Sequence, residues 1–488
     1  MKKNKLEWFG NVRGDLLAGI VVAIALIPEA IGFSIIAGVN PMMGLYASFC
    51  IAIVTSKFGG RPGMISAATG AMALVLTGLV KNHGIEYMLA ATILTGLIQM
   101  ILGYLKIGNL LKFIPRPVML GFVNALAILI FKAQLPYFDG EPVIMYGLVA
   151  LGIFIIYLFP KINKTIPSPL IAIVVITLLV TIFGIDVSRI GDMGNITNEL
   201  PKFIIPNVPI SIETLKIILP YAISLSLVGL VESLLTAQLL DELTDTPSDK
   251  NIECKGQGIA NIISGLFGGM AGCAMIGQSV ININSGGRGR LSTLTSGIVL
   301  MILILVLNTF VVQIPIAALV AVMIVVSIST FNWESLKRLN KVPKADAFVM
   351  CATVFVVLLT HNLAYGVVVG ILLSAISFAA KISEISIKKY EDKGNVKYVV
   401  KGQLFFASTL KFINSFDYTQ DVECVDIDLS KVKIWDESAV DAIDKVVIKF
   451  YKNGIETNLF GMSEPCLELI DKMAIHNKPG GLEMVSGH

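Results

Sequence analysis

Long apolar runs separated by short polar stretches fill the first 380 residues of the chain. A helix needs about 20 mainly apolar residues to cross the hydrocarbon core of a bilayer. Backbone polar groups find no water there, so such runs are expected to be helical. The pattern therefore predicts a polytopic α-helical membrane protein with about 14 spans. We place them at residues 15–37, 41–57, 64–80, 87–105, 112–135, 142–159, 167–184, 215–240, 256–271, 274–284, 291–312, 314–329, 345–361 and 364–382.

The polar loops between these spans differ in their content of lysine and arginine. Such residues collect on the cytoplasmic side of a membrane. With the amino terminus inside, alternate loops carry most of them, while the other loops carry few. The cation-rich loops contain Lys57, Arg61, Lys106, Lys112, Arg116, Lys161, Lys164, Lys250, Lys255, Arg288, Arg290, Lys337, Arg338, Lys341 and Lys344. This alternation predicts a multi-pass protein of the cell (plasma or inner) membrane with both termini in the cytoplasm, surrounded by membrane lipid.

Two of the predicted spans, around 66–76 and 272–282, are short and broken by glycine. They lie at similar distances into the two halves of the hydrophobic region. Each half also opens with a span that carries one glutamate, Glu29 or Glu232. Seven spans per half, an odd number, would insert the second half upside down, which predicts a 7+7 inverted repeat. Interrupted spans at corresponding positions in two such halves point to a transporter binding site, here at half-helices 3 and 10.

A helix that starts in mid-membrane presents unpaired N–H groups and a partial positive charge of roughly +0.5 at its first turn. Two such ends facing each other would bind a small anion without a cationic side chain. The residues expected to offer backbone there are Thr69, Gly70, Ala71, Ala274, Met275, Ile276 and Gly277. The alternative is that these small residues only allow close helix packing.

Glu232 is an ionisable group inside a predicted span, where a charge is costly unless it faces a cavity or a partner. Thr236 follows one turn later on the same helical face. This pair suits a bound Na⁺ or a proton as coupling ion. Glu29 follows Pro28, which would kink its helix and bring a second carboxylate to the cavity. For both glutamates the alternative is a structural hydrogen bond between helices.

Composition narrows the possible function classes. Hydrophobic residues make up 55% of the chain and charged residues 15%, which is far from the balance of a soluble domain. The net charge of +3 gives no reason to expect a nucleic-acid partner. The six cysteines lack metal-site or disulfide spacing, and no Ser/His/Asp or HExxH arrangement occurs. We therefore expect no enzyme activity and no cofactor apart from Na⁺ as a coupling ion. Residues 285–290 are interpreted as a tight turn and not as a phosphate loop, because the GxxxxGK[ST] pattern is missing.

Beyond residue 381 the composition becomes that of a soluble protein. We predict a transmembrane domain at 1–384, a charged linker at 385–395 and a small cytoplasmic α/β domain at 396–488. Period-two alternation indicates strands at 396–406 and 424–429, with a third at 457–460. Helices are expected at 439–451 and 465–473.

Several stretches together resemble the sulfate permease (SulP) family of anion transporters. Residues 28–48 resemble the family signature, with Glu29 where glutamine is usual, and Thr69-Gly70 resembles the motif of the third helix. Residues 256–261 and 285–288 also fit. The tail resembles a STAS domain, the module shared with anti-sigma-factor antagonists. The match spans nearly the whole chain.

The resemblance implies fourteen spans in a 7+7 inverted repeat, an anion of the sulfate or bicarbonate class held between helices 3 and 10, elevator-like transport, and a homodimer. In sodium-coupled bicarbonate members, a carboxylate and a threonine on helix 8 bind the cation. Glu232 and Thr236 match them, with Glu in place of Asp. Residues 274–276 read Ala-Met-Ile where those members read Gly-Ala-Thr. Gln278 is uncharged near a position that is often basic in the family.

In soluble STAS domains a phosphorylatable serine lies where this chain has Ser438, which suggests a regulatory site and a cytoplasmic partner. A plain helix cap is the alternative for Ser438. For the whole chain the favoured function is cation-coupled secondary transport. The alternatives are an uncoupled anion exchanger or channel and a membrane scaffold that signals through the STAS domain.

Overall fold

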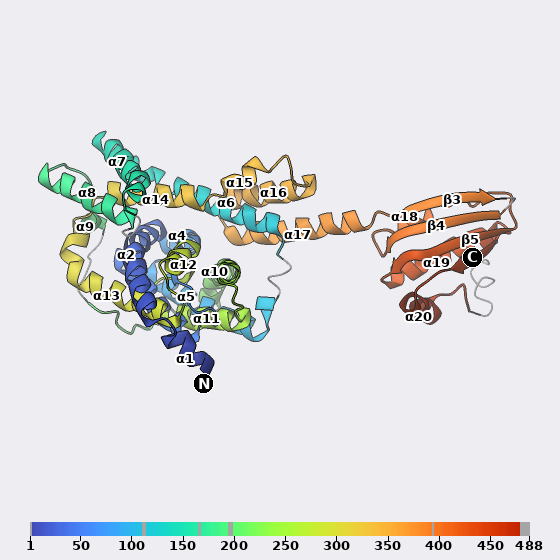
Figure 1. Ribbon diagram of the computed structural model, residues 1–488, viewed down its shortest axis with the longest axis horizontal. Helices are drawn as coiled ribbons and strands as arrows, with labels where there is room; N and C mark the ends of the chain where they lie inside the picture. The colour runs from blue at the N-terminus through green and yellow to red at the C-terminus, as the bar shows by residue number, and fades with distance from the viewer. Residues whose placement is uncertain (1, 110–113, 164–166, 194–198, 393–394, 479–488) are drawn as a thin grey trace. The chain divides into compact units, whose positions relative to one another are not determined.

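The computed structural model describes residues 2–109, 114–163, 167–193, 199–392 and 395–478 (Figure 1). The chain divides into two compact units, Met1–Ile371 and Leu372–His488, and the division falls inside the helix α17 (Leu363–Ile382). Each unit is considered by itself below.

The first unit is made almost entirely of helices. Their bounds are α1 (Lys2–Phe9), α2 (Val12–Ala37), α3 (Pro41–Phe58), α4 (Gly70–His83), α5 (Ile85–Tyr104), α6 (Arg116–Lys132), η2 (Leu135–Phe138), α7 (Ile144–Leu158), η3 (Phe159–Lys161), α8 (Ser168–Ile182), α9 (Ile190–Met193), α10 (Ile212–Thr244), α11 (Lys250–Leu266), α12 (Ile276–Asn284), α13 (Arg290–Val312), α14 (Ile316–Thr330), α15 (Trp333–Lys337), α16 (Lys344–Thr360) and α17 (Leu363–Ile382). Within the described residues, eight of these helical segments have the length and apolar composition that a membrane crossing requires. The prediction of a polytopic helical membrane protein is confirmed, while the count of fourteen spans and the inverted repeat stay predictions.

The helices of the first unit pack in two groups. In the first group, α11 packs against α3 and α5, α13 against α2 and α3, and α10 against α5. In the second group, α6 packs against α14 and α16, and α7 against α8 and α14. Contacts between the groups are made mainly by α2 and α4 on one side and by α6, α8 and α14 on the other.

The two glycine-broken segments meet inside the first group. β1 (Ser66–Ala68) precedes α4, and β2 (Gly272–Ala274) precedes α12. The two strands pair antiparallel, with Ala67 opposite Cys273. A Cβ atom at Gly272 would lie 2.1 Å from the carbonyl oxygen of Ala67, so the close approach of the backbones requires glycine there. Each broken segment is thus a short extended piece followed by a short helix, and the two extended pieces are hydrogen-bonded to each other.

In the part of the second unit that the structure describes, the strands form one four-stranded sheet in the order β3-β4-β5-β6. β3 and β4 pair antiparallel, whereas the β4–β5 and β5–β6 pairs are parallel. A hydrophobic core lies between the sheet and its helices and includes Tyr398, Phe412 and Phe450. The elements are β3 (Ser386–Asp392), β4 (Asn395–Leu404), α18 (Thr409–Ile413), β5 (Cys424–Ile434), α19 (Glu437–Lys452), β6 (Glu456–Phe460) and α20 (Glu464–Met473).

The predicted linker at 385–395 is wrong in its secondary structure, because it contains β3. Ile385 is buried in the core and Ile387 packs against it, while the neighbouring lysines and acids are mostly exposed. A charged edge strand has the composition of a linker, since charges on an edge discourage pairing with other chains. The predicted domain boundaries themselves stay predictions. Residues 393–394 and the end of the predicted domain, 479–488, lie outside the described residues.

Candidate functional site

A cavity of about 270 Å³ lies between the two helix groups, beside the ends of the two short helices. One wall comes from the first group and is partly polar. It consists of Glu29, Phe33, Thr69, Gly70, Glu232, Leu235, Met275, Ile276, Gly277, Gln278 and Ile281. The opposite wall comes from α6, α8 and α14 and is largely apolar. It consists of Phe122, Val123, Leu126, Ile130, Pro169, Val322, Val325, Val326, Ser329 and Thr330.

The amino ends of α4 and α12 both open on this cavity. Thr69 and Met275 hold the N-cap positions in extended conformations, and neither side chain caps its helix. The first intrahelical bonds run from Ala73 to Thr69 and from Ser279 to Met275. The preceding amide groups of each helix therefore have no intrahelical acceptor, and they carry the positive end of the helix dipole. A Cβ at Gly277 would meet no atom within 4 Å, so this residue leaves the second end open.

The cavity also holds two carboxylates, both half-buried. Glu29 comes from α2, just after the proline in that helix, and its Oε1 accepts a 2.6 Å hydrogen bond from Gln278 Nε2. Glu232 comes from α10, and its Oε2 accepts a hydrogen bond from the thiol of Cys273 at 3.0 Å. No lysine or arginine belongs to the lining that the structure describes.

Three predicted site residues lie outside the cavity lining. Ala71 is fully buried in α4. Ala274 is also buried; its amide donates to Ser233 Oγ at 3.0 Å, and its methyl group packs in a small apolar cluster. Thr236 is buried too, and its hydroxyl donates to the backbone carbonyl of Glu232 at 2.8 Å. The Thr236 hydroxyl therefore does not bind the Glu232 carboxylate in this structure. The other predicted residues, Thr69, Gly70, Met275, Ile276, Gly277, Glu29 and Glu232, line one cavity.

Sequence reasoning missed Cys273, which lies between the two parts of the site. Its sulfur is 3.0 Å from Glu232 Oε2 and 3.2 Å from Thr69 Oγ1, and the residue is completely buried. Its position inside a glycine-broken segment was the available signal. A lone cysteine in an apolar run gives no indication of what it contacts.

Buried amides hold the paired strands in place. Asn261 of α11 donates to the Gly272 carbonyl at 3.0 Å and accepts from the Gly272 amide at 2.9 Å. Gln257, one turn earlier, donates to Ser66 Oγ at 2.7 Å. Gly258 lies so close to α5 that a Cβ there would be 2.6 Å from the Gly96 carbonyl oxygen. The motif at 256–261 therefore serves close packing of α11 and support of the strands.

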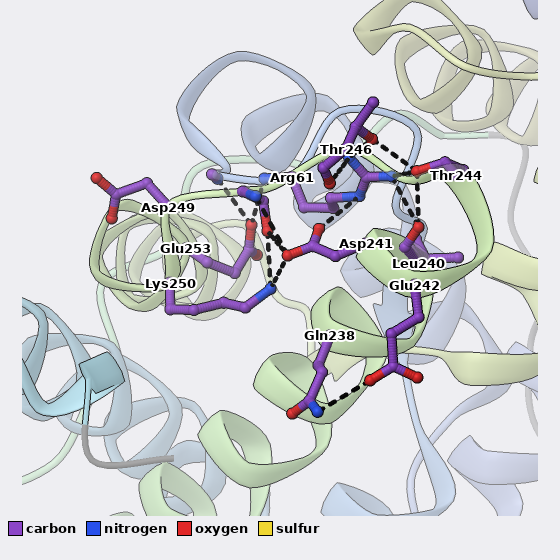
Figure 2. A network of polar contacts seen from close by, with 12 residues as sticks. Arg61, Gln238, Leu240, Asp241, Glu242, Thr244, Thr246, Asp249, Lys250 and Glu253 are labelled. Carbon is purple, nitrogen blue, oxygen red and sulfur yellow. Dashed lines mark hydrogen bonds and ion pairs between the residues drawn. The ribbon is translucent and has the colours of Figure 1, made fainter. Parts of the chain in front are cut away.

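A polar network fixes the loop that leads into β1 (Figure 2). The Arg61 side chain is 6% exposed, and its Nε lies 3.3 Å from Asp241 Oδ1. Neither of these two atoms has a hydrogen bond of good geometry, so the contact is an ion pair. Asp241 also pairs with Lys250 at 2.6 Å, and Glu253 accepts bonds from the Gly60 and Arg61 amides. Burial lowers the pKa of Arg61, while the Asp241 carboxylate opposes that shift.

In the second unit, Ser438 is the second residue of α19 and is exposed. The cap of this helix is Asp436, whose Oδ1 accepts a bond from the Ala439 amide at 2.9 Å. Its other carboxylate oxygen accepts from the Phe406 amide at 2.9 Å. The helix-cap alternative for Ser438 is thus wrong, and its role as a regulatory site stays a prediction.

The chain resembles known proteins along most of its length. Residues 12–144 and 141–353 match the model of the sulfate permease family, and residues 386–484 match that of the STAS domain. The chain is 59% identical over 471 residues to "Putative sulfate transporter YbaR" of Bacillus subtilis (strain 168), covering 96% of this chain and 98% of that protein. It is 30% identical over 420 residues to the bicarbonate transporter BicA of Picosynechococcus sp., covering 80% of this chain and 74% of that protein.

Two solved structures resemble this protein. The transmembrane domain of a cyanobacterial BicA has a TM-score of 0.65 at 28% identity, covering 75% of this chain and 98% of that one. Murine Slc26a9, an anion transporter in its inward-facing state, has a TM-score of 0.82 at 18% identity, covering 99% and 92%. The second likeness concerns the fold alone. With the family model matching most of the chain and the STAS model matching its tail, this protein belongs to the sulfate permease family of membrane anion transporters and carries a C-terminal STAS domain.

Proposed function

We propose that the protein is a secondary active transporter that moves a small inorganic anion, of the sulfate or bicarbonate class, together with a cation. The observation that carries the proposal is the meeting of two uncapped helix ends at one cavity. Backbone N–H groups and helix dipoles provide an anion site that needs no cationic side chain. Thr69, Gly70, Met275, Ile276 and Gly277 would surround the anion.

The two carboxylates in the cavity give the reason for coupling. Two like charges 4 Å apart repel by about 4 kcal/mol at an effective dielectric constant near 20, which is roughly a thousandfold in affinity. An anion would therefore bind well only when Glu29 and Glu232 are neutralised, by H⁺ or by Na⁺. A cation that relieves this repulsion raises anion affinity, and by linkage the anion raises the affinity for the cation.

The apolar wall suits an elevator-like movement of the first helix group against the second. A wall with few polar groups makes few directional bonds, so the polar face of α4 and α12 could slide along it without breaking many of them. In this proposal the protein is a homodimer in the cell membrane, with fourteen spans in a 7+7 inverted repeat. Both termini and the STAS domain face the cytoplasm, where Ser438 is available to a regulatory partner.

Uptake of labelled sulfate and of labelled bicarbonate into proteoliposomes tests the proposal. Each anion is offered with no gradient, with an inward Na⁺ gradient and with an inward H⁺ gradient. We expect one gradient to drive accumulation of one anion, and Glu232→Gln to abolish the response to the gradient. Glu242→Gln is the matched control, because Glu242 lies on the same helix but is exposed and outside the cavity. If neither anion accumulates under any gradient, coupled transport of these anions is wrong.

A second candidate is an uncoupled exchanger. It is supported by the hydrogen bonds that Glu29 and Glu232 accept from Gln278 and Cys273. Glutamates held by such bonds can have a purely structural role, which is what an uncoupled exchanger requires. Counterflow of labelled anion without any gradient, with Glu232→Gln as active as wild type, would establish this candidate instead. If the Glu232→Gln, Glu29→Gln and Thr69→Val variants all left the protein's function intact, the membrane-scaffold alternative would be favoured.

A further inference from the structure

We infer that Cys273 is a positioning residue that transmits the state of Glu232 to the anion site at Thr69. This inference rests on the proposed cation-coupled transport and names one contact that adds to the coupling by charge. The thiol of Cys273 is placed between the two side chains, 3.0 Å from Glu232 Oε2 and 3.2 Å from Thr69 Oγ1. Glu232 and Thr69 both line the cavity, while Cys273 itself is completely buried behind them.

The chemistry of the three groups fixes the direction of these bonds when Glu232 is ionised. A carboxylate can only accept hydrogen bonds, so the thiol of Cys273 must donate to it. A thiol has one proton, so its sulfur can only accept from Thr69. The hydroxyl proton of Thr69 is then turned toward the sulfur and away from the cavity. In that state Thr69 presents only lone pairs to the cavity, which repel an anion.

A cation at Glu232 changes these directions. Na⁺ at the carboxylate weakens Oε2 as an acceptor, and a proton on Oε2 turns that oxygen into a donor toward the sulfur. The thiol proton can then rotate to Thr69 Oγ1, which frees the Thr69 hydroxyl to donate to an anion in the cavity. Only torsions change, and no bond to hydrogen is broken. Anion affinity would rise because a repelling lone pair is replaced by a donor.

The packing around Cys273 keeps the thiol between its two partners. The strand pairing sets Cys273 opposite Ala67 of β1. On the other side, the α10 backbone at Gly229 lies close to Cys273: a Cβ built at Gly229 would be 3.5 Å from the Cys273 Cβ. Because Gly229 has no side chain, α10 packs directly against Cys273. Serine in place of Cys273 keeps one donor and the acceptor lone pairs at nearly the same position. Alanine removes both, which makes these two substitutions a matched pair.

The test compares anion binding to the purified full-length protein with and without the coupling cation. The probes are labelled sulfate and labelled bicarbonate. For each anion, the readout is the dissociation constant without the cation divided by the dissociation constant with it. Couplings between sites are typically about 5- to 150-fold. We expect wild type and Cys273→Ser to show such a ratio, and Cys273→Ala to lower it severalfold, leaving the part that comes from relief of charge repulsion at Glu29 and Glu232. Cys50→Ala, at another buried cysteine, serves as the control and should keep the wild-type ratio.

A second readout follows the thiol itself. The S–H stretching band of Cys273, isolated as the difference between wild type and Cys273→Ala, should shift when the cation is added. A merely structural cysteine would give no such shift. The inference is overturned if Cys273→Ala keeps the wild-type ratio, if Cys273→Ser loses it as fully as Cys273→Ala, or if the band stays fixed. A ratio of one in wild type would instead overturn the proposed coupling, and the relay with it.

Discussion

Replacing Arg61 by methionine should destabilise the first unit markedly, although Arg61 lies outside the cavity. The guanidinium bridges the loop before β1 and the end of α10. Its Nη1 donates to Thr246 Oγ1 at 2.9 Å, and its Nη2 donates to the Leu240 carbonyl at 3.1 Å and to Thr244 Oγ1 at 2.5 Å. Methionine keeps most of the apolar stem and removes the charge and all of these donors.

The expected loss can be bounded from the network in Figure 2. Removing one partner of a buried ion pair costs about 3–5 kcal/mol. Asp241 keeps Lys250 at 2.6 Å, and the hydroxyls of Thr244 and Thr246 keep their mutual bond at 2.6 Å. We therefore expect the lower end, about 3 kcal/mol. With an unfolding entropy of roughly 2 cal/mol/K per residue, this corresponds to a fall in Tm of ~4 °C for the unit Met1–Ile371.

Thermal unfolding of the full-length protein in detergent measures this shift. Glu242→Gln is the control, since Glu242 makes an exposed bond with Gln238 beside the network and should move Tm by less than about 1 °C. Adding Asp241→Asn to Arg61→Met should lower Tm further, because Lys250 then loses its ion-pair partner. An Arg61→Met protein that unfolds within 1 °C or so of wild type would refute the assigned role of this ion pair.

Three further outcomes are expected. Gly277→Ala should fold normally but weaken anion uptake, since its methyl group enters open space at the cavity. Gly70→Ala should weaken uptake and also lower Tm, because its Cβ would lie 2.8 Å from Phe33. Measurements of uptake and of thermal unfolding for both variants separate these effects. Asp436→Ala should lower the stability of α19 by about 1 kcal/mol, because Asp436 caps this helix, and Ser438→Ala should lower it by less than about 0.5 kcal/mol. Hydrogen exchange of the α19 amides in the full chain measures both losses. Burial raises the pKa of Asp444, but hydrogen bonds from His476 and Ile475 outweigh it and lower the pKa below its ordinary value. The ionised Asp444 therefore stabilises the folded second unit fully above the pKa that it has in the unfolded chain, near 3.9. This stabilisation is lost as the pH falls through the lower pKa of Asp444 in the folded protein. Urea unfolding should accordingly separate wild type from Asp444→Asn at pH 7 and bring them together in strong acid.

Much of the fold could be predicted from local patterns. The apolar runs located the helices of the first unit, because length and hydropathy alone decide whether a segment can cross a bilayer. The alternation at 396–406 located β4, and the amphipathic run at 439–451 located α19. The edge strand β3 was not predicted, because its many exposed charges hide the short alternation of Ile385, just before the strand, and Ile387 within it. Residues 430–434 continue β5 beyond its predicted end, since the signal of alternation weakens where lysines flank the strand.

The site could be predicted only in part. Glycine-broken segments pointed to Thr69, Gly70 and Gly277, because an interrupted helix leaves a signature in the sequence. Which neighbours turn toward the cavity depends on long-range packing. Ala274 is adjacent to the site in sequence, yet it faces an apolar cluster. The contact between Cys273 and Glu232 joins residues 41 positions apart, and no local rule relates them.

The hydrogen-bonded strands before α4 and α12 have a consequence for selectivity. Because β1 and β2 are paired residue by residue, the two halves of the chain cannot bring their helix ends closer together or farther apart independently. In the proposed transport cycle, the distance between the two helix ends would therefore stay constant. Selectivity would then depend on how well an ion fits this constant distance between the helix ends. Movement of the helices would change only the side of the membrane that the site faces.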